Sequence, residues 1–263
     1  MATEDVWAAG DLYEPYVGRW SRLVAARFLA ELDVPPGGDW LDLGCGTGAL
    51  SAAVLEARAP RRVLGIDPSE GFLATARRRI ADPRAEFRHG DAGALPVQDA
   101  SFDAVVSGLV LNFVPDPARA AAEMRRAARP GGTVAAYVWD YAEGMQMMRR
   151  FWDAARRLDP AAAELDEGRR FPLCRPEALR ALFEGAGLGG VETGAVEVPT
   201  LFRDFDDVWT PFLGGQGPAP GYCMSLDENR RAALREELRA MLPAAPDGRI
   251  ALVARAWTVR GTA

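Results

Sequence analysis

The sequence contains no lysine: all 31 of its basic residues are arginine. This absence excludes mechanisms that depend on a lysine side chain, such as a Schiff base, a phosphate-binding P-loop or the strand lysine of a kinase. Histidine is almost absent too, because His89 is the only one. Zinc sites built from two or three imidazoles are therefore excluded, and we expect no metal site. We expect His89 itself to be a half-buried residue at the end of a strand, not a catalytic group.

Cysteine is scarce, with three residues that stand far apart and form no CxxC pair: Cys45, Cys174 and Cys223. An odd number at this spacing makes no disulfide framework, which indicates a reducing, cytoplasmic compartment. The N-terminal residues are acidic where a signal peptide would be basic and then apolar. No run of 18 apolar residues is present, so we expect no membrane partner.

Acidic residues outnumber basic ones, 37 to 31, which gives a formal charge of −6. Without a clustered basic face, this balance argues against a nucleic-acid partner and favours a small molecule. A chain of 263 residues can bury a substantial core. We found no linker and no repeat, and therefore expect a single domain over residues 1–263.

Short strand-like runs alternate with helical patterns over the first 140 residues. The expected strands are 40–43, 62–66, 85–89, 102–107 and 133–139, and the expected helices are 48–57, 69–81 with Ser69 as N-cap, and 117–128. Such alternation predicts an α/β fold with a parallel, doubly wound sheet and helices on both faces.

The second half of the chain follows a different pattern. We expect helices at 142–158, 176–185 and 226–241 and strands at 191–198 and 250–259. Residues 209–222 are rich in proline, glycine and aromatics and are expected to lack regular structure. We interpret residues 1–35 as N-terminal lid helices, 36–140 as a cofactor-binding half, and 141–263 as cap helices and closing strands.

Three aspartates, Asp42, Asp67 and Asp91, fall at or just after the ends of the first three strands. Their spacings of 25 and 24 residues match one strand–helix repeat each, so the three carboxylates should share the edge of the sheet where ligands bind. The first one leads into a glycine turn, Gly44-Cys45-Gly46-Thr47-Gly48, which allows a close approach of the backbone to a ligand.

Two ligands compete for this turn. The spacing of the glycines also satisfies the dinucleotide pattern GxGxx(G/A), with Asp67 near the place of a ribose-binding acid. However, Asp42 would repel a pyrophosphate, whereas a ligand that carries an ammonium and a sulfonium would be favoured. Asp91 suits the amino group of adenine, which donates hydrogen bonds. The three acids therefore favour a cationic nucleoside over a dinucleotide.

Several segments of the sequence resemble the motifs of one known family. WLDLGCGTGAL at residues 40–50 is similar to motif I of the class I S-adenosylmethionine-dependent methyltransferases, and LGIDPSEGFLATAR at 64–77 resembles their second motif. Residues 90–132 resemble the adenine-contacting loop, fourth strand and following helix of the ubiquinone-biosynthesis-like (type 11) branch. The resemblance implies a Rossmann-like, mostly parallel seven-stranded sheet with an antiparallel last strand.

The resemblance also implies roles for individual residues toward S-adenosylmethionine, whose product is S-adenosylhomocysteine. Asp67, followed by Pro68, takes the position that binds the ribose diol, and Asp42 belongs to the same pocket. Gly44 and Gly46 flank the methionine moiety, Asp91 and the backbone of Ala92 hold adenine, and Ser107 lines the pocket. The N-terminal segment resembles a lid in which a tyrosine and an arginine meet the cofactor. We assign these roles to Tyr13 and Arg22, with Arg19 as the next choice for the cofactor carboxylate.

Aromatic residues that follow the fifth strand are the candidates for an acceptor site. Trp139 and Tyr141 stand at the expected strand tip, and Phe212 lies in the aromatic segment 209–222. We predict methyl transfer by in-line displacement to an O, N, S or C nucleophile of a small molecule, and name no catalytic residue. An NAD(P)-dependent oxidoreductase, or a protein that binds S-adenosylmethionine without transferring its methyl group, are the alternatives.

Overall fold

The computed structural model describes residues 17–215 and 217–263. The chain divides into two compact units. One unit comprises residues 21–138, 173–196 and 256–263, and the other comprises residues 1–20, 139–172 and 197–255. In this second unit the description starts at residue 17. The single domain expected from the sequence stays a prediction.

A seven-stranded sheet has the order β3-β2-β1-β4-β5-β7-β6. Its strands are β1 (Asp39–Leu43), β2 (Arg62–Asp67), β3 (Ala85–His89), β4 (Phe102–Gly108), β5 (Ala128–Trp139), β6 (Gly189–Phe202) and β7 (Ile250–Thr262). Strands β1 to β5 are parallel to one another, with Leu41 opposite both Leu64 and Val105. The last strand runs the other way, because Ala263 bonds to the start of β5 and Arg255 bonds to Asp140 just after its end. The predicted Rossmann-like sheet with an antiparallel last strand is confirmed.

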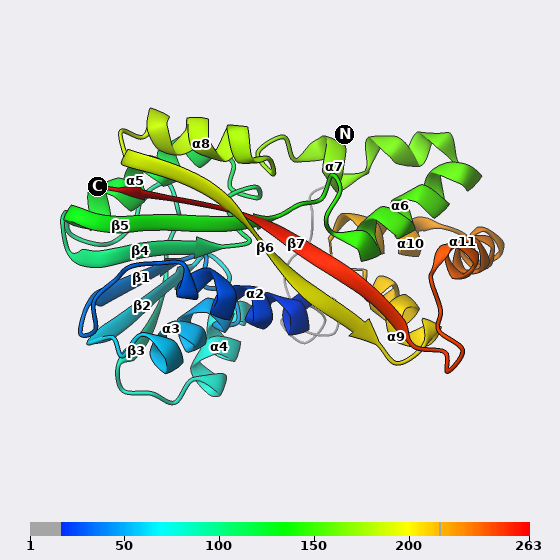
Figure 1. The fold of residues 1–263 in the computed structure, drawn as a ribbon, viewed down its shortest axis with the longest axis horizontal. Helices are drawn as coiled ribbons and strands as arrows, with labels where there is room; N and C mark the ends of the chain where they lie inside the picture. Colours follow the sequence, from blue (N-terminus) through cyan, green and yellow to red (C-terminus); the bar gives the residue numbers. More distant parts are fainter. Residues whose placement is uncertain (1–16, 216) are drawn as a thin grey trace. The chain divides into compact units, whose positions relative to one another are not determined.

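Helices connect the strands of the first unit, and the order of the strands determines which face of the sheet they cover (Figure 1). They are α2 (Arg19–Ala30), which enters this unit at Ser21, then α3 (Ala49–Ala57), α4 (Glu70–Arg79), α5 (Pro117–Ala127) and α8 (Pro176–Gly185). The chain builds outward from β1 to β3 and then outward on the other side through β4 and β5. Right-handed crossovers therefore place α3 and α4 on one face of the sheet and α5 on the other.

The core of the first unit consists of the inward side chains of the sheet. Trp40, Leu41 and Leu43 of β1 are fully buried, as expected for a central parallel strand covered on both faces. The Phe28 ring of α2 packs 4.7 Å from the Tyr137 ring of β5.

The second unit is mostly helical. It contains α6 (Gln146–Leu158), η2 (Pro160–Glu164), α7 (Glu167–Arg170), α9 (Phe205–Trp209), η3 (Thr210–Gly214), α10 (Pro218–Ser225) and α11 (Glu228–Met241). Among the described residues, no helix is long and apolar enough to cross a bilayer.

Several predicted boundaries were wrong, each for a local reason. Helix α6 starts at Gln146 and not at residue 142, because the Asp140 carboxylate accepts hydrogen bonds from the amides of Glu143 and Gly144 and holds a turn there. Strand β6 continues to Phe202, since the alternation of buried and exposed residues persists past Pro199. Residues 209–222, expected to be irregular, contain η3 and the start of α10, where Pro218 occupies a first-turn position that needs no amide hydrogen.

Other elements match their predictions closely. Strand 85–89 and helix 176–185 have the predicted bounds. The predicted N-cap Ser69 accepts a hydrogen bond from the Phe72 amide at 3.4 Å.

Candidate functional site

The glycine turn directly follows β1. Gly44 and Gly46 have φ angles of +71° and +53°, which side chains with a Cβ rarely adopt. A Cβ at Gly44 would lie 2.5 Å from the Val110 side chain, so this glycine allows close packing. At Gly46, by contrast, no described atom lies within 4 Å of such a Cβ. The turn therefore presents bare backbone at Gly46 with open space next to it, as a ligand cradle requires.

Asp67 connects the glycine turn to the end of β2. One carboxylate oxygen accepts from the Gly46 amide at 2.9 Å, and the other accepts from the Ser69 amide at 2.8 Å. Burial raises the pKa of Asp67 in spite of these two bonds, which lower it. Since each carboxylate oxygen can accept two hydrogen bonds, one acceptor position on each oxygen is left for a hydroxyl. This geometry fits a vicinal diol such as that of ribose.

Asp42 lies in β1, two residues before Gly44, and is buried. Its Oδ2 accepts a hydrogen bond from the Ser51 hydroxyl at 2.7 Å, while its buried Oδ1 has no partner among the residues that the structure describes. Burial, with a smaller contribution from the nearby Asp67 carboxylate, raises the pKa of Asp42 to about 7. A buried, orphaned acceptor beside the glycine turn favours a cationic ligand and opposes a phosphate. The residues present thus fit S-adenosylmethionine.

The third acid, Asp91, follows β3 and is exposed. Its carboxylate accepts from the Gly93 amide at 2.6 Å, which shapes a tight turn around Ala92. Pro68 is exposed next to Asp67. Their roles toward a ligand stay predictions.

Helix α5 fixes the loop that carries Asp91, a feature that the sequence reasoning missed. The Glu123 carboxylate accepts from the Leu95 amide at 2.8 Å. The Arg126 guanidinium donates to the carbonyls of Leu95 and Val97 at 3.1 and 2.9 Å and also pairs with Glu123. The signal in the sequence is a glutamate and an arginine three residues apart on one face of a helix.

Two further residues of this region have structural roles. The Ser107 hydroxyl is buried and donates to the Leu43 carbonyl at 2.9 Å, which ties the ends of β4 and β1 together. Cys45 is buried against Leu73, Ala76 and Phe87, and burial raises the pKa of its thiol well above its usual value. The thiol is therefore protonated at neutral pH. His89 is exposed, not half-buried as expected.

The N-terminal candidates are only partly described. Tyr13 lies outside the described residues. Arg22 is exposed on α2. Arg19, at the start of α2, pairs with Asp207 at 3.1 Å in the mostly helical unit. The choice between the two arginines for the cofactor carboxylate stays a prediction.

The three predicted acceptor residues are all buried in the mostly helical unit. Trp139, Tyr141 and Phe212 are at most 5% exposed. The Phe212 ring stacks on Phe151 at 4.3 Å. Phe212 is therefore packed in the core of this unit in the structure described here, and contact with an acceptor stays a prediction for all three residues.

A buried carboxyl lies within the same unit. The Trp152 indole donates to the Glu167 carboxylate, and burial raises the pKa of Glu167 to about 7. Nothing in the sequence marks this residue, because a single glutamate in an acidic segment does not stand out.

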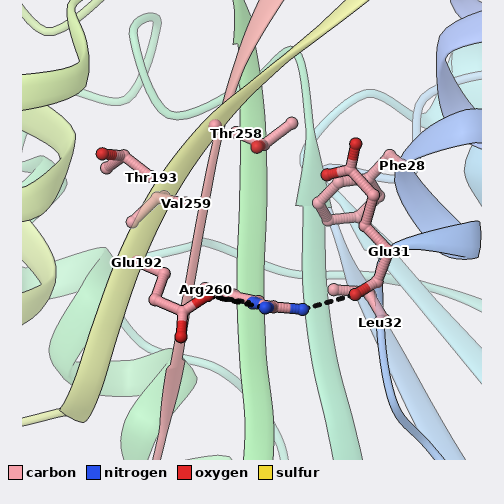
Figure 2. Close-up of a pocket in the computed structure, with 9 residues that line it drawn as sticks. Phe28, Glu31, Leu32, Glu192, Thr193, Thr258, Val259 and Arg260 are labelled. Carbon is pink, nitrogen blue, oxygen red and sulfur yellow. Dashed lines mark hydrogen bonds and ion pairs between the residues drawn. The ribbon is translucent and has the colours of Figure 1, made fainter.

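A polar groove of about 360 Å³ lies between the end of α2 and strands β6 and β7 (Figure 2). Arg260 crosses it, pairing with Glu192 at 2.6 Å and donating to the Glu31 carbonyl. Burial raises the pKa of the Glu31 side chain on the opposite wall. None of the predicted cofactor residues lines this groove, and its two carboxylates and one paired arginine offer no free cation for a phosphate.

The fold and the site together define a class of protein. A Rossmann-like sheet presents a glycine turn and acids at the ends of three consecutive strands, an arrangement that binds a nucleoside cofactor at the carboxyl edge.

Comparisons with known proteins narrow this class. Residues 41–136 match a family model described as a methyltransferase domain. The chain is 45% identical over 95 residues to a demethylmenaquinone methyltransferase of Clavibacter sepedonicus, which is 36% of this chain and 38% of that protein. Against relatives of this name the chain spans about half of their length or less, from 38% to 56%.

Solved structures share the fold over nearly the whole chain. A proposed methyltransferase of Bacillus halodurans C-125 matches with a TM-score of 0.60 at 16% identity, covering 90% of this chain and 97% of that one. A phosphoethanolamine N-methyltransferase of Haemonchus contortus, in complex with phosphomonomethylethanolamine and S-adenosylhomocysteine, matches at a TM-score of 0.58 and 18% identity, covering 95% and 56%. Residues 41–136 therefore carry a methyltransferase domain, and the solved structures share its fold.

Proposed function

We propose that the protein transfers the methyl group of S-adenosylmethionine to a small-molecule acceptor. The observation that carries this proposal is the shared edge of Asp42, Asp67 and Asp91 beside the bare backbone of Gly46. The buried, unpaired oxygen of Asp42 supports a cationic cofactor and counts against an NAD(P) pyrophosphate. The net charge of −6 supports a small molecule as the acceptor over a nucleic acid.

In this proposal each cofactor residue contacts a different part of S-adenosylmethionine. Asp67 accepts hydrogen bonds from the ribose hydroxyls, Asp91 and the Ala92 amide hold adenine, and Gly44 and Gly46 flank the methionine moiety. Pro68 and Ser107 complete the wall, and Arg22 with Tyr13 takes the carboxylate. When bound, the cofactor supplies an activated methyl group on a sulfonium.

The contribution of the chain to the chemistry is orientation. Methyl transfer is an in-line displacement, and most of the acceleration comes from holding the acceptor atom close to the methyl carbon with water excluded. Trp139, Tyr141 and Phe212 are proposed to provide the apolar surface that holds the acceptor. An acceptor that is deprotonated at neutral pH needs no general base.

The test has two stages. Calorimetric titrations of S-adenosylhomocysteine and NADPH into the full chain compare the two cofactors, and we expect binding of the first alone. Binding of NADPH with no binding of S-adenosylhomocysteine would overturn the proposal. A screen of small-molecule acceptors for release of S-adenosylhomocysteine then separates a transferase from a protein that only binds the cofactor.

A further inference from the structure

The groove of Figure 2 is a ligand-sized space that the proposed methyl transfer does not use. Its volume of about 360 Å³ lies within the range of small-molecule pockets. The end of α2, the first half of β6 and the last third of β7 line it. These three segments belong to the same compact unit, so the groove is formed within that unit alone.

The groove is separate from the proposed cofactor site. Strands β4 and β5 lie between β7 and β1, which places β7 about 14 Å from the strand that leads into the glycine turn. Along the sheet, Ala263 at the end of β7 exchanges hydrogen bonds with Gly131 and Gly132 near the start of β5. Arg260 is three residues before Ala263 and therefore lies toward the amino edge of the sheet, whereas the cofactor acids follow the carboxyl ends of their strands.

The side chains of the groove carry one uncompensated negative charge. Arg260 pairs with Glu192 at 2.6 Å and donates to the backbone carbonyl of Glu31. The Glu31 carboxylate itself makes no hydrogen bond or ion pair with the residues that the structure describes. Burial raises the pKa of Glu31, and the Arg260 guanidinium lowers it by less. A carboxylate that has lost part of its hydration without gaining a partner favours a cation beside it.

A buried hydroxyl faces the same space. Thr258 is 6% exposed, and its side chain extends from β7 toward α2 (Figure 2). Within residues 17–215 and 217–263 its hydroxyl has no hydrogen-bond partner, whereas that of Thr193 accepts from Arg180 at 3.2 Å. Since buried polar groups are nearly always paired, the Thr258 hydroxyl is available to accept a hydrogen bond from a ligand.

Gly194 of β6 keeps this hydroxyl accessible. A Cβ at Gly194 would lie 3.0 Å from the Thr258 hydroxyl oxygen. The φ angle of Gly194 is not in the left-handed region, so its backbone conformation does not require a glycine. The bare backbone at this position and the unpaired hydroxyl therefore form one small polar cradle.

The remaining walls of the groove restrict the kind of cation. Phe28, Leu32 and Val259 contribute hydrocarbon surface. Among the described residues, no three histidine, cysteine, aspartate or glutamate side chains come together as ligands for a metal ion. A single carboxylate beside apolar side chains matches an organic cation better than a metal ion, which needs several oxygen ligands.

We propose that this groove binds a small organic cation, a primary ammonium on a short apolar body. The ammonium carries three donors, one of which bonds to the Glu31 carboxylate and another to the Thr258 hydroxyl. The apolar body lies against Phe28 and Leu32. The site does not depend on the proposed methyl transfer, because it lies outside the cofactor pocket.

The probe is 2-(4-fluorophenyl)ethylamine, which is cationic at neutral pH, and 2-(4-fluorophenyl)ethanol is its neutral counterpart. Binding to the full chain is followed by fluorine NMR with S-adenosylhomocysteine in excess, which occupies the acids of the proposed cofactor site. We expect saturable binding of the amine, and binding of the alcohol at least tenfold weaker. Equal affinity for the two probes would overturn the proposal.

Two variants with the same change of charge locate the cation. Glu31→Gln removes the unpaired carboxylate at nearly constant volume and should weaken binding of the amine at least tenfold, with no change for the alcohol. Asp33→Asn is the matched control: Asp33 is exposed two residues further along the chain and does not line the groove. This control should bind the amine as the unmodified protein does. Equal losses in both variants would show a general effect of charge, and no loss in Glu31→Gln would place the amine elsewhere. Either result would overturn the proposal.

A third variant and a direct map keep the test independent of Glu31. Thr258→Val replaces the unpaired hydroxyl by a methyl group, so it should weaken binding of the amine several-fold without lowering the melting temperature. Amide chemical shifts in the unmodified protein should change on addition of the amine at residues 192–194 and 258–260 and stay constant at 44–48. Changes confined to 44–48 would assign the amine to the cofactor pocket and overturn the proposal. Since every readout is binding in the groove, failure of the screen for methyl transfer would not alter these outcomes.

Discussion

The Ser51 hydroxyl at the start of α3 donates a 2.7 Å hydrogen bond to Oδ2 of Asp42, and the other oxygen of the same carboxyl is buried without a described partner. The fold therefore stabilises Oδ2, whereas Oδ1 has lost its contact with water, and this desolvation disfavours the ionised carboxylate. Burial accordingly raises the pKa of Asp42 to about 7. The glycine turn begins two residues later, at Gly44.

The first prediction concerns Asp42 and pH. A carboxyl with a pKa of about 3.9 in the unfolded chain and a higher one in the folded protein binds an extra proton when folded between these values. Its contribution to the free energy of unfolding therefore falls as pH rises from about 4 to about 7. Asp42→Asn, whose amide oxygen still accepts from Ser51, should melt at least about 2 °C above the unmodified protein at pH 8. The difference should shrink toward pH 4.

Thermal unfolding without cofactor, recorded from pH 4 to 8, checks this prediction. Glu167→Gln is the positive control, because the pKa of that buried carboxyl is also raised to about 7. Parallel melting curves for Asp42→Asn and the unmodified protein across this range would contradict the assignment.

The second prediction concerns Asp67. Asp67→Ala removes the acceptors for the Gly46 and Ser69 amides as well as the proposed bonds to ribose. Each charge-assisted hydrogen bond contributes about 1.5–3 kcal/mol before compensation by water. Affinity for S-adenosylhomocysteine, measured by calorimetry, should fall at least tenfold, and the chain should remain folded. Asp67→Asn keeps one acceptor oxygen and should lose less. Unchanged affinity in both variants would refute the ribose assignment.

The third prediction concerns Cys45, which lies between two turn glycines. Its thiol is buried and protonated at neutral pH, so it is neither a nucleophile nor easily alkylated. Cys45→Ala should retain most of the turnover, with a modest loss of stability from the contact with Phe87. A loss of kcat beyond about a hundredfold with intact cofactor binding would point to a covalent mechanism.

The fourth prediction concerns the hydrogen bonds from Arg126 to the loop that bears Asp91. Arg126→Met should free the carbonyls of Leu95 and Val97 while keeping the packing of the side chain stem. Amide hydrogen exchange over residues 91–99 should become faster, and affinity for adenosine should fall several-fold. Arg125→Met, at the neighbouring position of α5, is the control and should leave both unchanged.

The sequence was sufficient to predict most of the parallel part of the sheet, because β1, β2 and β4 are short, mostly apolar runs followed by turn signals. It also located the three acids, since one strand–helix repeat separates each from the next. The partners of those acids could not be predicted. Ser51 and Ser69 are ordinary residues whose roles depend on the angle at which α3 and α4 leave the strands.

The second half of the chain was harder to predict for a different reason. The segment at 209–222 combines proline, glycine and aromatics, a composition that fits either a loop or short helices. Burial of Trp209 and Phe212 favours the helical form, and only the tertiary packing around Phe151 supplies that burial. In the same way, the ion pair between Arg19 and Asp207 joins residues that lie 188 positions apart in the sequence.

The fifth prediction separates acceptor binding from core packing for the three buried aromatic residues Trp139, Tyr141 and Phe212. Tyr141→Phe removes one hydroxyl and almost no volume, so it should lower kcat/KM for the acceptor while leaving affinity for S-adenosylhomocysteine within about twofold. Trp139→Ala should lower kcat/KM in the same direction, but because Trp139 is 2% exposed it should also lower the free energy of unfolding by about 3–5 kcal/mol. Phe212→Ala removes a ring that is stacked on Phe151 and fully buried, and should lower the free energy of unfolding by about 3–5 kcal/mol. Chemical denaturation and steady-state kinetics on all three variants test this division. If Tyr141→Phe loses stability and cofactor affinity together, these residues are core alone, and the acceptor wall must be sought elsewhere.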